Sequence, residues 1–338
     1  MNGRERVLAM LGGRTVDRLP IMPITMMFAA RHIGAKYGRY ALDQRILVEA
    51  QLKTAEDFDF DHVSAITETR EAPDCGATIR KFDDQPFAID ESRARLAEKS
   101  KLASLRMPDP MTAEHMRDRI DAITALRSRI GGEKIVEGWV EGPCGAAADL
   151  RGINTLMLDF HDDPVFVREL FEFVLQLGLS FGGAQIMSGA EVIGVGDPAA
   201  SLVGPRLYEE FVWPFEKRLV DGLHTLGTRV RLHICGNTSR ILRSIRQLGC
   251  DIVDIDSSVS LVEARKNLGP DQVVLGGIDP VRVFQNGSAE QVCAAIAESS
   301  SQAGPRYILG AGCEIPPDTP PGNVLEMHRF SRLNAAGA

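Results

Sequence analysis

The fold is decided by residues 229–238, Arg229-Val230-Arg231-Leu232-His233-Ile234-Cys235-Gly236-Asn237-Thr238. This pattern predicts a short strand that ends at a glycine turn and leads into a helix. Because side chains two apart on a strand point the same way, we expect His233 and Cys235 to project together at the strand's carboxyl end, where α/β enzymes place their chemistry. An imidazole and a thiolate directed at one point suit a zinc ion. The alternative is a buried histidine beside a small buried cysteine.

The composition is that of a soluble globular protein with a substantial core, since 44% of the 338 residues are hydrophobic and 25% are charged. The length fits one α/β barrel, which needs about 250 residues plus insertions. We therefore predict a single domain over residues 1–338. A net charge of -8 without a long basic run argues against nucleic acid or an anionic membrane as a partner.

Several features of the chain favour the cytoplasm. Residues 1–6 lack the apolar core of a signal peptide, and the six cysteines lack the density of a disulfide scaffold, so we expect reduced thiols that are free to bind metal. Residues 173–190 carry no formal charge but are interrupted by glycine, serine and glutamine. That pattern fits a buried helix better than a helix that spans a membrane.

Short apolar strands alternate with helices along the whole chain. Around the opening stretch, which is the fifth strand, the pattern predicts strands at residues 21–26, 62–66, 135–141, 191–195, 252–255, 273–277 and 307–310. Residues 75–89 predict a small hairpin over the mouth of the sheet. Eight such strands indicate a single (β/α)8 TIM barrel with a small N-terminal hairpin insertion. A doubly wound open sheet is the alternative.

A third candidate metal ligand follows the last predicted strand, in Gly310-Ala311-Gly312-Cys313-Glu314-Ile315-Pro316-Pro317. The glycines on both sides of Cys313 allow a sharp turn and leave the sulfur uncovered. In a barrel, this loop and the end of the fifth strand share the same mouth. His233, Cys235 and Cys313 then form a site with three protein ligands and one open position, which is the usual arrangement of catalytic zinc. The alternative is that Cys313 only fills space under a tight turn.

Acidic residues also follow several predicted strands, and we favour two of them as catalytic candidates. Glu141 ends the third strand and Asp197 follows the fourth. Carboxylates at these positions can orient a metal ligand, transfer a proton or bind substrate. The alternative for each is a helix cap or a solvated loop residue.

Nearly the whole chain resembles the uroporphyrinogen decarboxylase superfamily, which includes zinc methyltransferases that act with cobalamin. The segments that carry the resemblance are Gly138-Trp139-Val140-Glu141-Gly142-Pro143, residues 232–238, residues 249–256, Leu275-Gly276-Gly277-Ile278-Asp279-Pro280 and residues 310–323. The resemblance implies a (β/α)8 barrel with its site at the carboxyl ends of the strands.

The details of the resemblance favour the methyltransferase branch. The decarboxylases carry an Arg-Gln-Ala-Gly-Arg-Tyr loop after the first strand, and residues 30–40 keep only its final Gly-Arg-Tyr. The tyrosine of their Gly-Pro-x-Thr...Tyr segment is replaced by Asp149, and the histidine of their final Gly-His-Gly is replaced by Ala311. The zinc ligands of the methyltransferases match His233, Cys235 and Cys313.

The sequence therefore predicts a zinc-dependent methyltransferase that moves a methyl group between a corrinoid protein and a thiol or another small acceptor or donor. The chain has no Asp-x-His-x-x-Gly corrinoid signature, so we expect the corrinoid on a separate partner protein. The alternatives are a tetrapyrrole decarboxylase of the uroporphyrinogen type and a non-catalytic module that binds zinc or corrinoid. The methyl donor, the acceptor and the choice between a monomer and a homodimer stay open.

Overall fold

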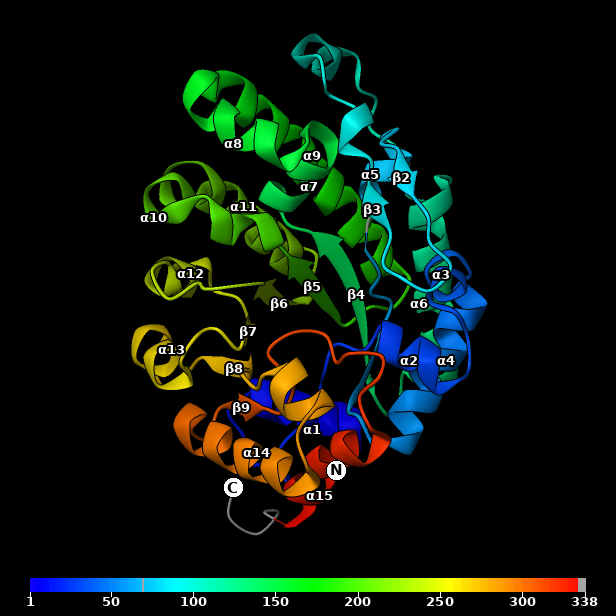
Figure 1. The fold of residues 1–338 in the computed structure, drawn as a ribbon, viewed down its shortest axis with the longest axis vertical. Coiled ribbons are helices and arrows are strands. Elements are labelled where there is room, and N and C mark those ends of the chain that lie inside the picture. The colour runs from blue at the N-terminus through cyan, green and yellow to red at the C-terminus, as the bar shows by residue number, and fades with distance from the viewer. Residues whose placement is uncertain (69, 334–338) are drawn as a thin grey trace.

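Seven parallel strands form one curled sheet in the computed structural model, with helices on its outer side (Figure 1). The strands follow one another around the sheet in chain order. They are β1 (His62–Ser64), β4 (Ile135–Glu141), β5 (Val192–Gly196), β6 (Arg229–Ile234), β7 (Ile252–Ile255), β8 (Val273–Gly276) and β9 (Tyr307–Ile308). The structure describes residues 1–68 and 70–333, so residue 69 and the end of the predicted 1–338 domain lie outside the described residues.

The helices cover the sheet because each returning strand must run parallel to the one before it, which requires a crossover. The α-helices are α1 (Gly3–Leu11), α2 (Met27–His32), α3 (Tyr37–Leu42), α4 (Gln44–Asp57), α5 (Glu71–Asp74), α6 (Glu114–Ile130), α7 (Pro143–Arg151), α8 (Ile153–Asp162), α9 (Pro164–Met187), α10 (Gly204–Leu207), α11 (Trp213–Thr225), α12 (Leu242–Leu248), α13 (Leu261–Leu268), α14 (Ala289–Ala303) and α15 (Pro321–Leu333). Short 3-10 or π turns are η1 (Glu91–Arg93), η2 (Lys99–Ser104), η3 (Pro198–Leu202), η4 (Tyr208–Val212) and η5 (Pro280–Gln285).

The strand predicted at residues 21–26 is wrong as a strand. Only Ile21 forms an isolated bridge, to Leu309. Pro20 and Pro23 lack the backbone N–H that a strand would donate, which explains why no longer ladder forms. The segment is still held at both edges of the sheet, because the Ile21 carbonyl accepts from the Asp61 amide at 2.9 Å and the Pro20 carbonyl accepts from the Leu309 amide at 2.8 Å. The architecture is thus TIM-barrel-like, with seven strands.

The strand register places the functional side chains beside one another. His233 on β6 is opposite Gly196 on β5 and opposite Asp254 on β7. Nearly every residue of these strands is buried, as expected for a parallel sheet packed on both faces. The carboxyl ends of β5, β6 and β7 therefore form a fixed platform.

Two further segments bear on the sequence predictions. Within residues 75–89, β2 (Ile79–Arg80) pairs antiparallel with β3 (Ala88–Ile89). In the described part of the chain, α9 is the one helix long and apolar enough to cross a membrane by length and composition. It contacts α7, α8, α11 and β4, and twelve of its residues, including Phe171 and Phe181, are buried.

Candidate metal centre and active-site cavity

His233, Cys235 and Cys313 come together at the carboxyl end of the sheet. Nε2 of His233 lies 3.2 Å from Sγ of Cys235, and Sγ of Cys235 lies 3.9 Å from Sγ of Cys313. All three ligand atoms lie within 4.8 Å of one another. One nitrogen and two sulfurs at this spacing are a donor set that fits tetrahedral zinc. The structure thus brings together three residues that the sequence separates by up to 80 positions.

Tight turns carry the two cysteines to this point. After Cys235, Gly236 adopts a φ of +84°, which favours glycine, and its amide donates to the Asp256 carboxylate. The loop that bears Cys313 passes so close to Ser257 that a Cβ on Gly312 would lie 2.4 Å from the Ser257 backbone nitrogen. Only glycine fits there, so this glycine sets the position of the Cys313 sulfur.

A buried chain of charges fixes the orientation of the His233 ring. Nδ1 of His233 lies 3.3 Å from the carbonyl oxygen and 3.4 Å from Oδ2 of Asp254. Arg231 donates to Asp254 Oδ2 at 2.6 Å and to Glu137 Oε1 at 3.2 Å. Because Nδ1–H can donate to Asp254, the Nε2 lone pair is left for the two sulfurs, as in carboxylate–histidine–zinc arrangements.

The two thiols are electrostatically linked. A hydrogen bond from Cys235 and the neighbouring His233 lower the pKa of Cys313 to about 5, against the opposing effect of burial. The same pairing with Cys313, together with burial, raises the pKa of Cys235. The two sulfurs thus compete for one proton. A divalent metal ion would remove this competition, because both sulfurs could then bind it as thiolates.

The three candidate ligand residues line a cavity of about 280 Å³. Ile24, Ile66 and Trp139 form an apolar cluster on its wall. The remaining lining residues are mostly polar: Met26, Thr67, Glu68, Arg70, Glu141, Asp149, Gly196, Pro198 and Glu314. A cavity with one apolar wall and a few convergent polar groups is the usual form of a small-molecule site.

Glu141, one of the two predicted catalytic residues, lines this cavity. Its Oε2 accepts from Nη2 of Arg70 at 2.9 Å, and its backbone amide donates to Glu71 at 2.8 Å. Burial is the main reason why the pKa of Glu141 lies well above its usual value, with Asp149 and Glu71 adding to the rise while Arg70 opposes it. A raised pKa makes this carboxyl group a stronger proton acceptor than an ordinary glutamate.

Asp197, the other predicted catalytic residue, lies apart from the cavity lining. Its carboxylate is fully buried and accepts from the backbone amides of Cys144 at 3.0 Å and Gly145 at 2.7 Å. These amides belong to the first turn of α7, where a carboxylate satisfies free N–H groups and complements the helix dipole. Burial and the neighbouring Glu216 raise the pKa of Asp197.

Four further polar residues at the site are not among the residues that the sequence favoured: Glu68 was considered only as one of several acidic residues after strands, and Asp254, Arg70 and Glu314 were not considered. Asp254 lies within a buried strand, and only the strand register reveals that it faces His233. Glu68 and Arg70 follow β1, and Glu314 follows Cys313 directly. For Glu68, Arg70 and Glu314, the sequence signal that could have indicated a place at the site was their position shortly after a strand.

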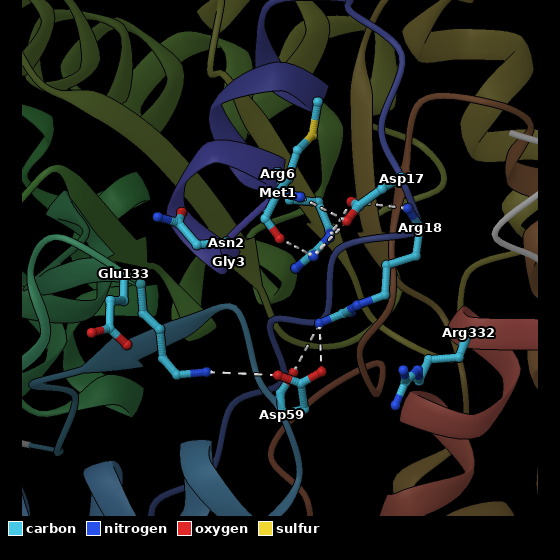
Figure 2. A pocket seen from close by; sticks show the side chains of 10 residues that line it. Met1, Asn2, Gly3, Arg6, Asp17, Arg18, Asp59, Glu133 and Arg332 are labelled. Carbon is cyan, nitrogen blue, oxygen red and sulfur yellow. Dashed lines mark hydrogen bonds and ion pairs between the residues drawn. The ribbon is translucent and has the colours of Figure 1, made fainter.

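A second cavity, of about 620 Å³, has a different character (Figure 2). Its lining residues Asp59 and Lys134 precede β1 and β4, so it lies at the amino ends of the strands. Several of the charges around it are paired: Arg6 contacts Asp17 at 2.6 Å and Arg18 contacts Asp59 at 2.9 Å. This network ties α1 to the base of the sheet, whereas the candidate metal centre lies at the opposite end.

The chain belongs to the uroporphyrinogen decarboxylase (URO-D) family, whose model matches residues 2–332. The resemblance inferred from the sequence motifs is thereby confirmed.

Within that family, the chain is similar to enzymes of two kinds. It is 28% identical over 333 residues to the methylcobamide:CoM methyltransferase MtbA of Methanosarcina mazei, covering 96% of each chain. It is 26% identical over 262 residues to the uroporphyrinogen decarboxylase of Geobacter metallireducens, covering 75% of this chain and 76% of that protein. Among solved structures, a methyltransferase from Methanosarcina mazei matches with a TM-score of 0.90 and 19% identity, covering 99% of this chain and 100% of the other. That structural likeness shows the fold.

Proposed function

We propose that the protein is a zinc-dependent methyltransferase that moves a methyl group between a corrinoid protein and a small thiol. The observation that carries the proposal is the convergence of one imidazole nitrogen and two thiol sulfurs, within 4.8 Å, on the wall of a cavity. The similarity to MtbA, over 96% of both chains, supports the same reading.

His233, Cys235 and Cys313 would hold the zinc ion, and the fourth position would face the cavity. A zinc ion held there would lower the pKa of a bound thiol, and a corrinoid on the partner protein would carry the methyl group. The chain's own part is to fix the donor atoms. Asp254 keeps His233 in one orientation, and the glycine at position 312 sets the Cys313 turn.

The other cavity residues prepare the reacting thiol. The wall made of Ile24, Ile66 and Trp139 excludes water and so strengthens every electrostatic interaction inside the cavity. Glu141, held by Arg70, is placed to accept the proton that the thiol loses. Asp197 acts at a distance, because it anchors α7, the helix that begins beside Glu141.

Decarboxylation of a tetrapyrrole is the second candidate, and the site gives it less support. Four carboxyl side chains line the cavity, from Glu68, Glu141, Asp149 and Glu314. A polycarboxylate substrate would meet repulsion rather than the arginines that such a substrate needs. The position of the decarboxylases' final histidine holds Ala311, a buried methyl group without acid–base chemistry.

Several finer points are part of the proposal. The hydrogen bonds of residues 20–22 to both sheet edges would close a (β/α)8-type barrel, with residues 79–89 as a small insertion. The enzyme would act in the cytoplasm, together with a separate corrinoid protein. Light scattering of the purified protein distinguishes a monomer from a homodimer.

The test combines metal analysis with a transfer assay. We expect about one zinc per chain, lost in Cys235→Ala and in Cys313→Ala and retained in Cys293→Ala, a matched change on α14 away from the site. Methylcobalamin and a panel of thiols should give methylated thiol with the zinc-loaded protein only. A protein that binds zinc but transfers no methyl group in any combination would be the non-catalytic module, and decarboxylation of uroporphyrinogen without zinc would favour the second candidate.

A further inference from the structure

Asp149 is a cavity residue to which the proposed mechanism gives no role. It lies on α7 and lines the same cavity as the metal centre. Among the described residues, no hydrogen bond or ion pair holds its carboxylate, although Arg70 exerts a favourable long-range influence. A carboxyl group that faces a cavity without a partner is available to a ligand.

The position of Asp149 is unfavourable for the protein itself. It occupies the last turn of α7, which ends at Arg151, where a negative charge opposes the helix dipole. Burial and the nearby carboxylates of Glu71 and Glu91 raise its pKa to about 7. Nothing in the packing of α7 requires a carboxylate there, so its presence points to a partner that enters the cavity.

The charged residues of the cavity indicate which charge the ligand of Asp149 carries. Apart from His233, which the proposed function assigns to the metal, Arg70 is the one basic side chain among the described residues that line the cavity. Its guanidinium is already engaged by Glu141 at 2.9 Å and by Glu71 at 3.5 Å. An anionic group on a substrate would therefore find no free cation, and it would face the carboxyl groups of Glu68 and Asp149.

We propose that Asp149 binds the end of the substrate remote from its sulfur atom, and that this end carries a positive charge, as in an aminothiol. The inference rests on the proposed function, because it takes the thiol to be held at the metal centre. It makes Asp149 a residue that determines specificity. The predicted substrate class is a small thiol with an ammonium group. A neutral thiol should bind less tightly, and a thiol with a sulfonate or carboxylate should bind least tightly.

Three thiols of equal chain length test the proposal: 2-aminoethanethiol, 2-mercaptoethanol and 2-mercaptoethanesulfonate. Their binding to the zinc-loaded protein is measured by isothermal titration calorimetry, alongside kcat/KM with methylcobalamin. The three thiols differ in intrinsic acidity, so each affinity is compared between the wild type and Asp149→Asn, which cancels that difference. Asp162→Asn, at an exposed position on the adjacent helix α8, is the matched control.

We expect Asp149→Asn to weaken binding of the aminothiol about tenfold, to leave 2-mercaptoethanol nearly unchanged and to improve binding of the sulfonate. Asp162→Asn should leave all three affinities as in the wild type. An equal effect of Asp149→Asn on all three thiols, or tightest binding of the sulfonate with no change in the variant, would overturn the inference while leaving methyl transfer intact. Failure of all three thiols to bind or to be methylated would instead refute the proposed function.

Discussion

Replacing Asp254 by asparagine tests whether the buried carboxylate controls the proposed metal centre. The side chain is completely buried, accepts from Arg231 at 2.6 Å and lies 3.4 Å from Nδ1 of His233. Asparagine keeps the shape but removes the charge, and its amide can turn an N–H toward the ring and favour the wrong tautomer. Loss of a carboxylate behind a ligating histidine lowers metal affinity about 10- to 100-fold, which is about 1.4–2.7 kcal/mol.

The same substitution affects folding. Arg231 and Asp254 are both inaccessible to solvent, and removing one member of a buried pair destabilises a protein by about 3–5 kcal/mol. Arg231 keeps its contact with Glu137 at 3.2 Å, and asparagine still offers an oxygen. We therefore expect a loss near the lower limit, about 3 kcal/mol, in the free energy of unfolding.

Competition with a chromogenic chelator measures the zinc affinity, and urea denaturation in the presence of EDTA measures the metal-free stability. Asp251→Asn is the matched control, because Asp251 contacts His224 at 2.8 Å just before the same strand, at the end remote from the cysteines. This variant should bind zinc as the wild type does. Unchanged zinc affinity in Asp254→Asn, with the stability loss present, would refute the role of Asp254 in orienting His233.

Three further predictions concern α7, the carboxylates and the cavity wall. The folded-state pKa of Asp149, about 7, exceeds the unfolded value of about 3.9, so this carboxyl group binds more protons in the folded state and its own contribution to stability should fall between pH 4 and pH 7. Asp149→Asn should remove that decline, gaining about 2–4 kcal/mol at pH 8 in urea denaturation, and parallel pH profiles of the two proteins would contradict this. Asp197→Asn should lower the free energy of unfolding by about 1–2 kcal/mol, because it weakens the capping of α7. Zinc affinity should be retained. A loss of zinc without a loss of stability would argue instead for a role of Asp197 at the metal. A Cβ added to Gly194 would lie 1.9 Å from the Trp139 ring, so Gly194→Ala should lower stability by about 1–3 kcal/mol and change the tryptophan fluorescence, and an unchanged spectrum would show that the ring does not rest on that glycine.

Local sequence patterns were sufficient for the sheet and for the placement of the three ligand residues. Short, almost wholly apolar strands that end at glycine turns can be recognised from the local sequence, and His233 and Cys235 are two positions apart at the end of one of them. The strand predicted at residues 21–26 failed for an equally local reason, since Pro20 and Pro23 limit the ladder to one bridge. Spacing and chemistry could therefore predict which residues meet, once a barrel-like order of strands was assumed.

The roles of the acidic residues depended on information that a sequence pattern does not contain. Glu141 ends a strand and Asp197 follows one, so from the sequence both looked equally suited to chemistry. The structure distinguishes them by the groups that their side chains contact. Glu141 lines the cavity, whereas the Asp197 carboxylate accepts from backbone amides of α7. Asp149 is the opposite case: its sequence position suggested no function, because a carboxylate in a helix is ordinarily exposed to solvent. Only its position on a cavity wall, with Arg70 already engaged by other carboxylates, gives that residue a function to test.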